Sequence, residues 1–122
     1  MQRDHVHLED MRNVARDIAR YVERFELEQV WNDPDAQRLF RAVFGELGES
    51  AGRVSEKTKS RLPSVPWRQI IATRNKVVHD YERVNYDVLY GAGRKDIPVL
   101  IDELNAILDR EDPIDETEHT NA

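Results

Sequence analysis

The chain has 122 residues, a formal net charge of −6 and no cysteine, which allows one small domain with its own core. The lack of cysteine excludes a disulfide framework, a thiol nucleophile and a cysteine-ligated zinc site. No apolar run approaches the ~20 residues that span a bilayer, and the first residues lack the hydrophobic stretch of a signal peptide. A cytoplasmic protein without a membrane partner is therefore expected.

The first half of the chain predicts two long helices. Over residues 4–28, apolar side chains recur at spacings of three and four, which marks one buried helical face: Leu8, Met11, Val14, Ala15, Ile18, Val22 and Phe25. Asp33 is suited to cap a second helix, with Pro34 at the first helical position, where a missing N–H costs nothing. Within that helix, Gly45 and Gly48 stand three residues apart, a spacing that favours a close helix crossing.

The second half of the chain predicts a loop and then more helix. Residues 57–66 are polar and contain prolines, which indicates a loop. A third helix is expected to begin near Pro66 and to continue through the segment that ends at Tyr81, with these apolar residues on it: Trp67, Ile70, Ile71, Val77 and Val78.

The last part of the chain is expected to form a short helix and a final long one. Asn85 is suited to cap the short helix over residues 86–90, which the glycines of residues 91–93 should end. Asp96 can then cap the final helix, with Pro98 tolerated in its first turn.

These elements predict an all-α fold, an up-and-down helical bundle of four long helices plus one short helix. We expect the bundle to occupy residues 1–110. Residues 111–122 are acidic and have little apolar content, so a disordered tail is expected there.

The charge is unevenly distributed along the chain. Residues 109–122 hold six acids and one base, so the remaining residues are nearly neutral. Residues 53–83 hold eight bases and three acids, which makes this segment positive. A polyanion that touches one face responds to such local charge more than to net charge. Solvated helix surface is the simpler explanation of such a segment.

The most informative stretch is the octapeptide from Arg74 to Tyr81, with the sequence RNKVVHDY. Phosphoryl chemistry without a metal needs at least two side chains, an arginine that stays cationic and a histidine that titrates near neutrality. This segment contains both. In a regular helix, the side chains of Arg74 and His79 would diverge by roughly 140°. Asn75 would share the face of His79, whereas Tyr81 would nearly eclipse Arg74.

Three arrangements would still bring Arg74 and His79 to one phosphate. The helix ends or loosens before His79, the long stem of Arg74 reaches around the helix, or two copies of the chain pool their residues across a twofold axis. An arginine and a histidine on a solvated helix are also common without any catalytic role, and Tyr81 can be an ordinary bundle aromatic with a wet hydroxyl.

No metal or other cofactor is expected. His5 and His7 have a spacing that metal ligands use, as do Glu116 and His119. The first pair lies near one end of the chain and the second in the acidic tail, where a fixed geometry is not expected.

The octapeptide matches the Arg-x4-His-x-Tyr pattern of HEPN-domain toxins. Further segments, in the same order and over residues 4–108, make the chain similar to the HepT-like (DUF86) branch of that family: Gly45-Glu46, Val54-Ser55, Pro66-Trp67-Arg68-Gln69-Ile70 and Asp96-Ile97-Pro98-Val99-Leu100. The resemblance implies a HEPN-like bundle that forms a homodimer.

The resemblance also implies a function and a site. The family contains metal-independent RNA endonucleases that are the toxins of toxin–antitoxin pairs, with tRNA as a suspected substrate. Carried over to this chain, Arg74 and His79 would be the catalytic pair, and Asn75 would orient the imidazole or a phosphate oxygen. The basic segment then supplies candidate RNA contacts at these residues: Arg68, Lys76 and Arg83.

Tyr81 matches the tyrosine that, in this branch, a minimal nucleotidyltransferase antitoxin modifies with AMP. Added nucleotide phosphates beside Arg74 would occupy the place of the RNA phosphate and so neutralise the toxin. The alternative is a non-catalytic helical interaction module that partners a nucleotidyltransferase.

Overall fold

The computed structural model describes the backbone of residues 2–121 and the side chains of residues 3–110. Its four long helices are α1 (Gln2–Arg24), α3 (Pro34–Arg53), α5 (Trp67–His79) and α6 (Tyr86–Asn121). The shorter elements are α2 (Leu27–Asn32), α4 (Glu56–Arg61) and the 3₁₀ turn η1 (Tyr81–Arg83). Over this described backbone there is no strand, so the prediction of an all-α bundle with four long helices is confirmed.

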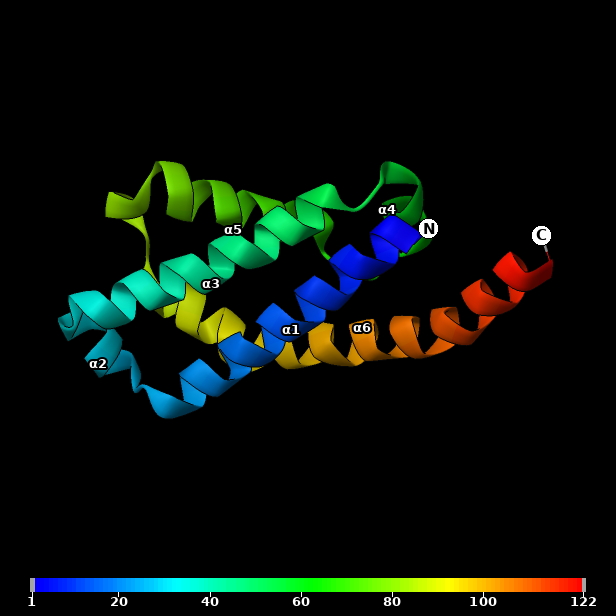
Figure 1. Ribbon diagram of the computed structural model, residues 1–122. Helices are drawn as coiled ribbons and strands as arrows, with labels where there is room; N and C mark the ends of the chain where they lie inside the picture. Colours follow the sequence, from blue (N-terminus) through cyan, green and yellow to red (C-terminus); the bar gives the residue numbers. More distant parts are fainter. Residues whose placement is uncertain (1, 122) are drawn as a thin grey trace.

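The long helices pack as neighbouring pairs around one core (Figure 1). Helix α1 lies between α3 and α6, and α3 in turn packs against α5. Helix α5 therefore rests mainly on α3, at one side of the bundle. The expected apolar face of α1 is buried, apart from the half-buried Val14 and Phe25 at its edge.

Helix α1 ends four residues before the predicted boundary, at Arg24. The hydroxyl of Tyr90 in α6 lies 2.8 Å from the carbonyl oxygen of Val22 and 2.7 Å from that of Phe25. This contact satisfies carbonyls that the end of a helix leaves without an intrahelical partner. The chain can therefore turn after Phe25 and form the separate helix α2, which the spacing of apolar residues alone did not predict.

Part of the predicted loop over residues 57–66 is the short helix α4. The hydroxyl of Ser55 accepts a hydrogen bond from the backbone N–H of Thr58 and so caps α4. The carboxylate of the buried Asp4 in α1 accepts bonds from the backbone N–H and the hydroxyl of Ser55, at 2.9 and 2.6 Å, and from the hydroxyl of Thr58. Helix α4 is thus held by polar contacts, and the prediction of a loop was wrong there.

Helix α6 runs unbroken from Tyr86 to Asn121, so the predicted break at residues 91–93 and the cap at Asp96 were wrong. A Cβ atom on Gly93 would lie 2.6 Å from Cγ1 of Val22, which means that this glycine serves the close approach of α1 and α6. Pro98 consequently lies in the interior of α6, where it has no N–H to donate to the preceding turn.

Two predicted caps are confirmed. The carboxylate of Asp33 accepts a hydrogen bond from the N–H of Asp35 at the start of α3, with Pro34 at the first helical position. The amide oxygen of Asn85 accepts one from the N–H of Asp87 at the start of α6. The side chains of residues 111–122 lie outside those described, so the disordered tail stays a prediction. Among the described residues, no helix is long and apolar enough to cross a membrane.

Candidate functional site

Two glycines bring α3 and α5 into close contact, as their spacing predicted. A Cβ atom on Gly45 would lie 3.6 Å from Val77 and 3.8 Å from Val78, which is ordinary packing distance. A Cβ atom on Gly48 would lie 2.1 Å from the Cβ of Arg74, which no real side chain tolerates. The octapeptide is therefore seated directly on the glycine face of α3.

The crossing at Gly48 fixes the path of the Arg74 side chain. Arg74 is half-buried, and its stem passes over the bare backbone of Gly48. Its guanidinium then donates a hydrogen bond to Oδ1 of Asn75 at 3.2 Å. Asn75 and His79 are four residues apart in the same helix, so their side chains share a face. The guanidinium of Arg74 thus lies on the side of α5 toward Asn75, whose face also carries His79.

His79 is the last residue of α5, and its side chain is exposed. Asp80 follows in a non-helical conformation, with φ −140° and ψ 44°. Within the described side chains, the imidazole makes no hydrogen bond or ion pair, so both ring nitrogens remain available to a ligand. An unpaired imidazole is suited to move a proton at a phosphate ester.

Asp80 reduces the positive charge of two predicted RNA contacts. Its carboxylate pairs with Nζ of Lys76 at 3.5 Å and with Nε of Arg83 at 3.9 Å. These groups are all more than one-third exposed, so the pairs are weak and open to exchange for another anion. Arg68 is exposed and has no acidic partner in the described part of the chain.

Tyr81 does not lie where a continuous helix would place it. Because α5 ends at His79, the regular helix in which Tyr81 would nearly eclipse Arg74 does not continue that far, and the prediction of a third helix running through Tyr81 was wrong. Tyr81 belongs instead to η1 and is 54% exposed. The guanidinium carbon of Arg41, in α3, lies 5.2 Å from the centre of its ring. The cation beside the candidate modification site is therefore Arg41.

Arg41 is the residue that sequence reasoning missed. It precedes Gly45 by four residues and Gly48 by seven, so all three lie on one face of α3. That spacing could have indicated that Arg41 also faces the octapeptide. The guanidinium of Arg41 donates to the hydroxyl of Tyr86 at 2.6 Å. No carboxylate in the described part of the chain pairs with it.

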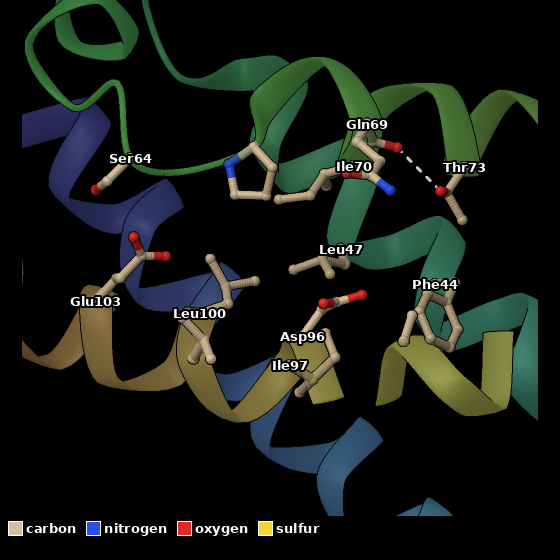
Figure 2. A pocket seen from close by; sticks show the side chains of 13 residues that line it. Phe44, Leu47, Ser64, Gln69, Ile70, Thr73, Asp96, Ile97, Leu100 and Glu103 are labelled. Carbon is tan, nitrogen blue, oxygen red and sulfur yellow. Dashed lines mark hydrogen bonds between the residues drawn. The ribbon is translucent and has the colours of Figure 1, made fainter. Parts of the chain in front are cut away.

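A separate cleft of about 320 Å³ lies between α3, α5 and α6 (Figure 2). Its walls are mostly apolar, and its α6 side carries the carboxylates of Asp96 and Glu103. On α5 it is lined by Gln69 and Thr73, which lie on a different face from Asn75 and His79. The acids and the position make this cleft a poor site for an RNA phosphate.

The described side chains contain no group of three or more His, Cys, Asp or Glu residues placed to hold a metal ion. The octapeptide itself carries a guanidinium, an amide, an imidazole and a phenol.

Comparisons with known proteins point to ribonucleases. Residues 11–107 match the family model described as Ribonuclease HepT-like. The chain is 29% identical over 90 residues to a candidate RNase of Caldanaerobacter subterraneus subsp. tengcongensis, covering 74% of this chain and 80% of that protein. It is 28% identical over 101 residues to the "Probable ribonuclease HepT" of Thermococcus cleftensis, covering 82% of this chain and 92% of that protein. No solved structure matches the chain significantly.

Proposed function

Because the chain belongs to the HepT-like ribonuclease family, we propose that it is the toxin of a bacterial toxin–antitoxin pair and cleaves RNA without a metal ion. One observation carries this proposal. The bare backbone of Gly48 and the amide of Asn75 direct the guanidinium of Arg74 toward the helix face of His79. A fixed cation and an unpaired imidazole at one helix end are the groups that phosphodiester cleavage needs.

The proposed reaction is attack by a ribose 2′-OH on the adjacent phosphorus. His79 moves the proton, the bond to the 5′-oxygen breaks, and that oxygen leaves as a hydroxyl, which gives a 2′,3′-cyclic phosphate on the other fragment. Arg74 stabilises the charge that develops on the pentacoordinate phosphorus. DNA lacks the 2′-OH and would resist cleavage. We take tRNA as the substrate on the strength of the family resemblance.

The active species in this proposal is a homodimer. His79 and Asn75 are exposed on a helix that packs mainly against α3, so one protomer alone leaves the reacting phosphate largely in water. A second copy across a twofold axis would supply its own Arg74 and His79 and would wall off the site.

The antitoxin in this proposal is a minimal nucleotidyltransferase that acts on Tyr81. The phenol oxygen attacks the α-phosphorus of ATP, pyrophosphate leaves, and AMP stays on the side chain. The exposure of Tyr81 and the nearby Arg41 support this role, because a nucleotide phosphate there would meet a cation. The added negative charge would then compete with the RNA backbone.

The test is expression of the wild-type chain in bacteria beside Arg74→Ala and His79→Ala, together with cleavage of tRNA by each purified protein in excess chelator. Wild type should arrest growth and cleave RNA, and both variants should do neither. Equal behaviour of all three would reject the ribonuclease. If the free chain cleaves nothing but binds a nucleotidyltransferase stably, it is instead a non-catalytic interaction module.

A further inference from the structure

A second pocket, of about 390 Å³, adjoins Tyr81 at the end of the bundle formed by α2, α3, η1 and the start of α6. Its lining holds two guanidinium groups, Arg38 and Arg41, against one carboxylate, Glu82. Aromatic rings complete it, from Trp31, Tyr81 and Tyr86. A cavity with a net positive charge and several aromatic walls suits a ligand that has both an anionic group and a flat ring.

The two arginines have capacity for an anion. Arg41 uses one N–H on the neutral hydroxyl of Tyr86, and among the described residues no carboxylate pairs with its remaining donors. Arg38 pairs with Asp35 at 3.2 Å, but both groups are more than two-thirds exposed, so the pair is weak. A phosphate can therefore recruit both guanidinium groups without breaking a buried interaction.

Trp31 supplies a fixed but accessible aromatic surface. Its Nε1 donates to the carboxylate of Asp87 at 2.7 Å, and its ring packs edge-on against Tyr86, with 5.2 Å between the centroids. The amide of Gln37 donates to its backbone carbonyl at 3.1 Å. The side chain is nevertheless 45% exposed. An indole held by these contacts loses little further freedom when a base stacks on it.

The pocket is aligned with the candidate catalytic residues. Arg41 and Gly48 lie on the same face of α3, about 10 Å apart along its axis, and Gly48 carries the stem of Arg74. The ring of Tyr81 lies beside Arg41 at the same end. A nucleotide in the pocket would thus neighbour both a strand at Arg74 and a group joined to Tyr81.

We propose that this pocket is a nucleotide subsite, in which Arg38 and Arg41 hold a phosphate and Trp31 stacks on the base. The choice of a nucleotide rests on the proposed function. Its occupant is a nucleoside monophosphate unit, which comes either from the RNA strand next to the cleaved bond or from the adenylate joined to Tyr81.

The first experiment measures binding of 5′-AMP to the full chain by calorimetry and by tryptophan fluorescence. Trp67 is buried, so quenching should come from Trp31 and should disappear in Trp31→Phe. Arg41→Gln should weaken binding roughly tenfold, whereas Glu82→Gln should strengthen it. Arg53→Gln is the matched control, because Arg53 is on the same helix, exposed and paired with Glu49, outside the pocket. Equal affinities in the Arg41 and Arg53 variants, or no binding at millimolar AMP, would overturn the subsite.

The second experiment separates the two sources of nucleotide. A short oligoribonucleotide is titrated against His79→Ala, with and without Arg41→Gln. Weaker RNA binding in the double variant assigns the pocket to a nucleotide of the RNA. Unchanged RNA binding, with AMP binding lost, assigns it to the adenylate on Tyr81. If the chain cleaves no RNA but binds AMP through Arg41, the subsite stands and the ribonuclease fails. If RNA is cleaved while Arg41→Gln changes neither the affinity for AMP nor the affinity for RNA, the ribonuclease stands and the subsite fails.

Discussion

Gly48 lies directly beneath Arg74, so closely that a Cβ atom on the glycine would be 2.1 Å from the Cβ of the arginine. The first atom of each side chain is involved, so no rotation about χ1 can relieve the overlap. The spacing of α3 and α5, and with it the position of the guanidinium of Arg74, depends on the hydrogen atom that glycine carries there.

A series of alanine substitutions on α3 tests this dependence. Gly48→Ala should cost about 1–3 kcal/mol of stability, because the helices must move apart. Gly52→Ala should gain about 0.5–1 kcal/mol, since that position meets no atom within 4 Å and alanine favours helix. The free energy of unfolding is measured by urea titration for each variant and compared with that of the wild type. Equal stability of the two variants would mean that the crossing is looser than described.

Asn75 should matter to RNA cleavage through Arg74. In Asn75→Ala the guanidinium loses its bond at 3.2 Å, and the single-turnover rate should fall about tenfold. In Asn75→Asp the rate should fall further, because a carboxylate would pair with Arg74 and repel the RNA phosphate. Gln69→Glu adds the same charge on another face of α5 and serves as the control. An aspartate variant no slower than the alanine variant would contradict a positioning role for Asn75.

Stability should depend on the protonation of Asp4. Burial alone raises the pKa of this carboxyl, but the hydrogen bonds from Ser55 and Thr58 outweigh that effect and lower the pKa below its ordinary value of 3.8. The ionised form is therefore favoured in the folded chain, and its contribution is complete above about pH 4. That contribution is lost as the pH falls through the lowered pKa.

The variant Asp4→Asn isolates this effect. It should be less stable than wild type by about 1–3 kcal/mol at pH 7, and the difference should shrink as urea titrations are repeated at lower pH. The exposed Asp10→Asn controls for the loss of one negative charge on α1. A difference that stays constant down to pH 2 would show that the carboxylate of Asp4 is not the group involved.

The hydroxyl of Tyr90 should stabilise the end of α1. It lies within hydrogen-bond distance of the carbonyl oxygens of Val22 and Phe25, so Tyr90→Phe should cost about 1–2 kcal/mol in thermal or urea unfolding. Tyr21→Phe is the comparison, because the hydroxyl of Tyr21 makes no hydrogen bond among the described residues. Equal losses of stability in both variants would show that the hydroxyl of Tyr90 does not stabilise the end of α1.

The sequence was sufficient for elements with local signals. The spacing of apolar residues located α1 and α5, and the caps at Asp33 and Asn85 follow from side chains that bond to their own next turn. The all-helical fold follows from the same patterns. The catalytic roles of Arg74 and His79, which come from the octapeptide and the family resemblance, stay predictions.

Features that depend on distant residues could not be predicted in this way. Helix α4 is held by Asp4, some fifty residues earlier in the chain. The sequence around Gly93 predicted a helix end, but this glycine instead allows α6 to pack closely against Val22 of α1. The predicted position of Tyr81 assumed a helix that continues past His79, where α5 in fact ends. The cation found beside the ring of Tyr81 is Arg41, which comes from another helix.

The packing of α5 mainly against α3 has a consequence for detecting partners. A helix with one main packing neighbour opens locally at a lower free-energy cost than a helix enclosed on two sides, so its backbone amides exchange with solvent sooner. Anything that docks on the exposed side of α5, whether a second copy, an RNA or an antitoxin, should slow that exchange over residues 67–79. Hydrogen–deuterium exchange would then report engagement of the octapeptide in solution, even for a variant that cannot react.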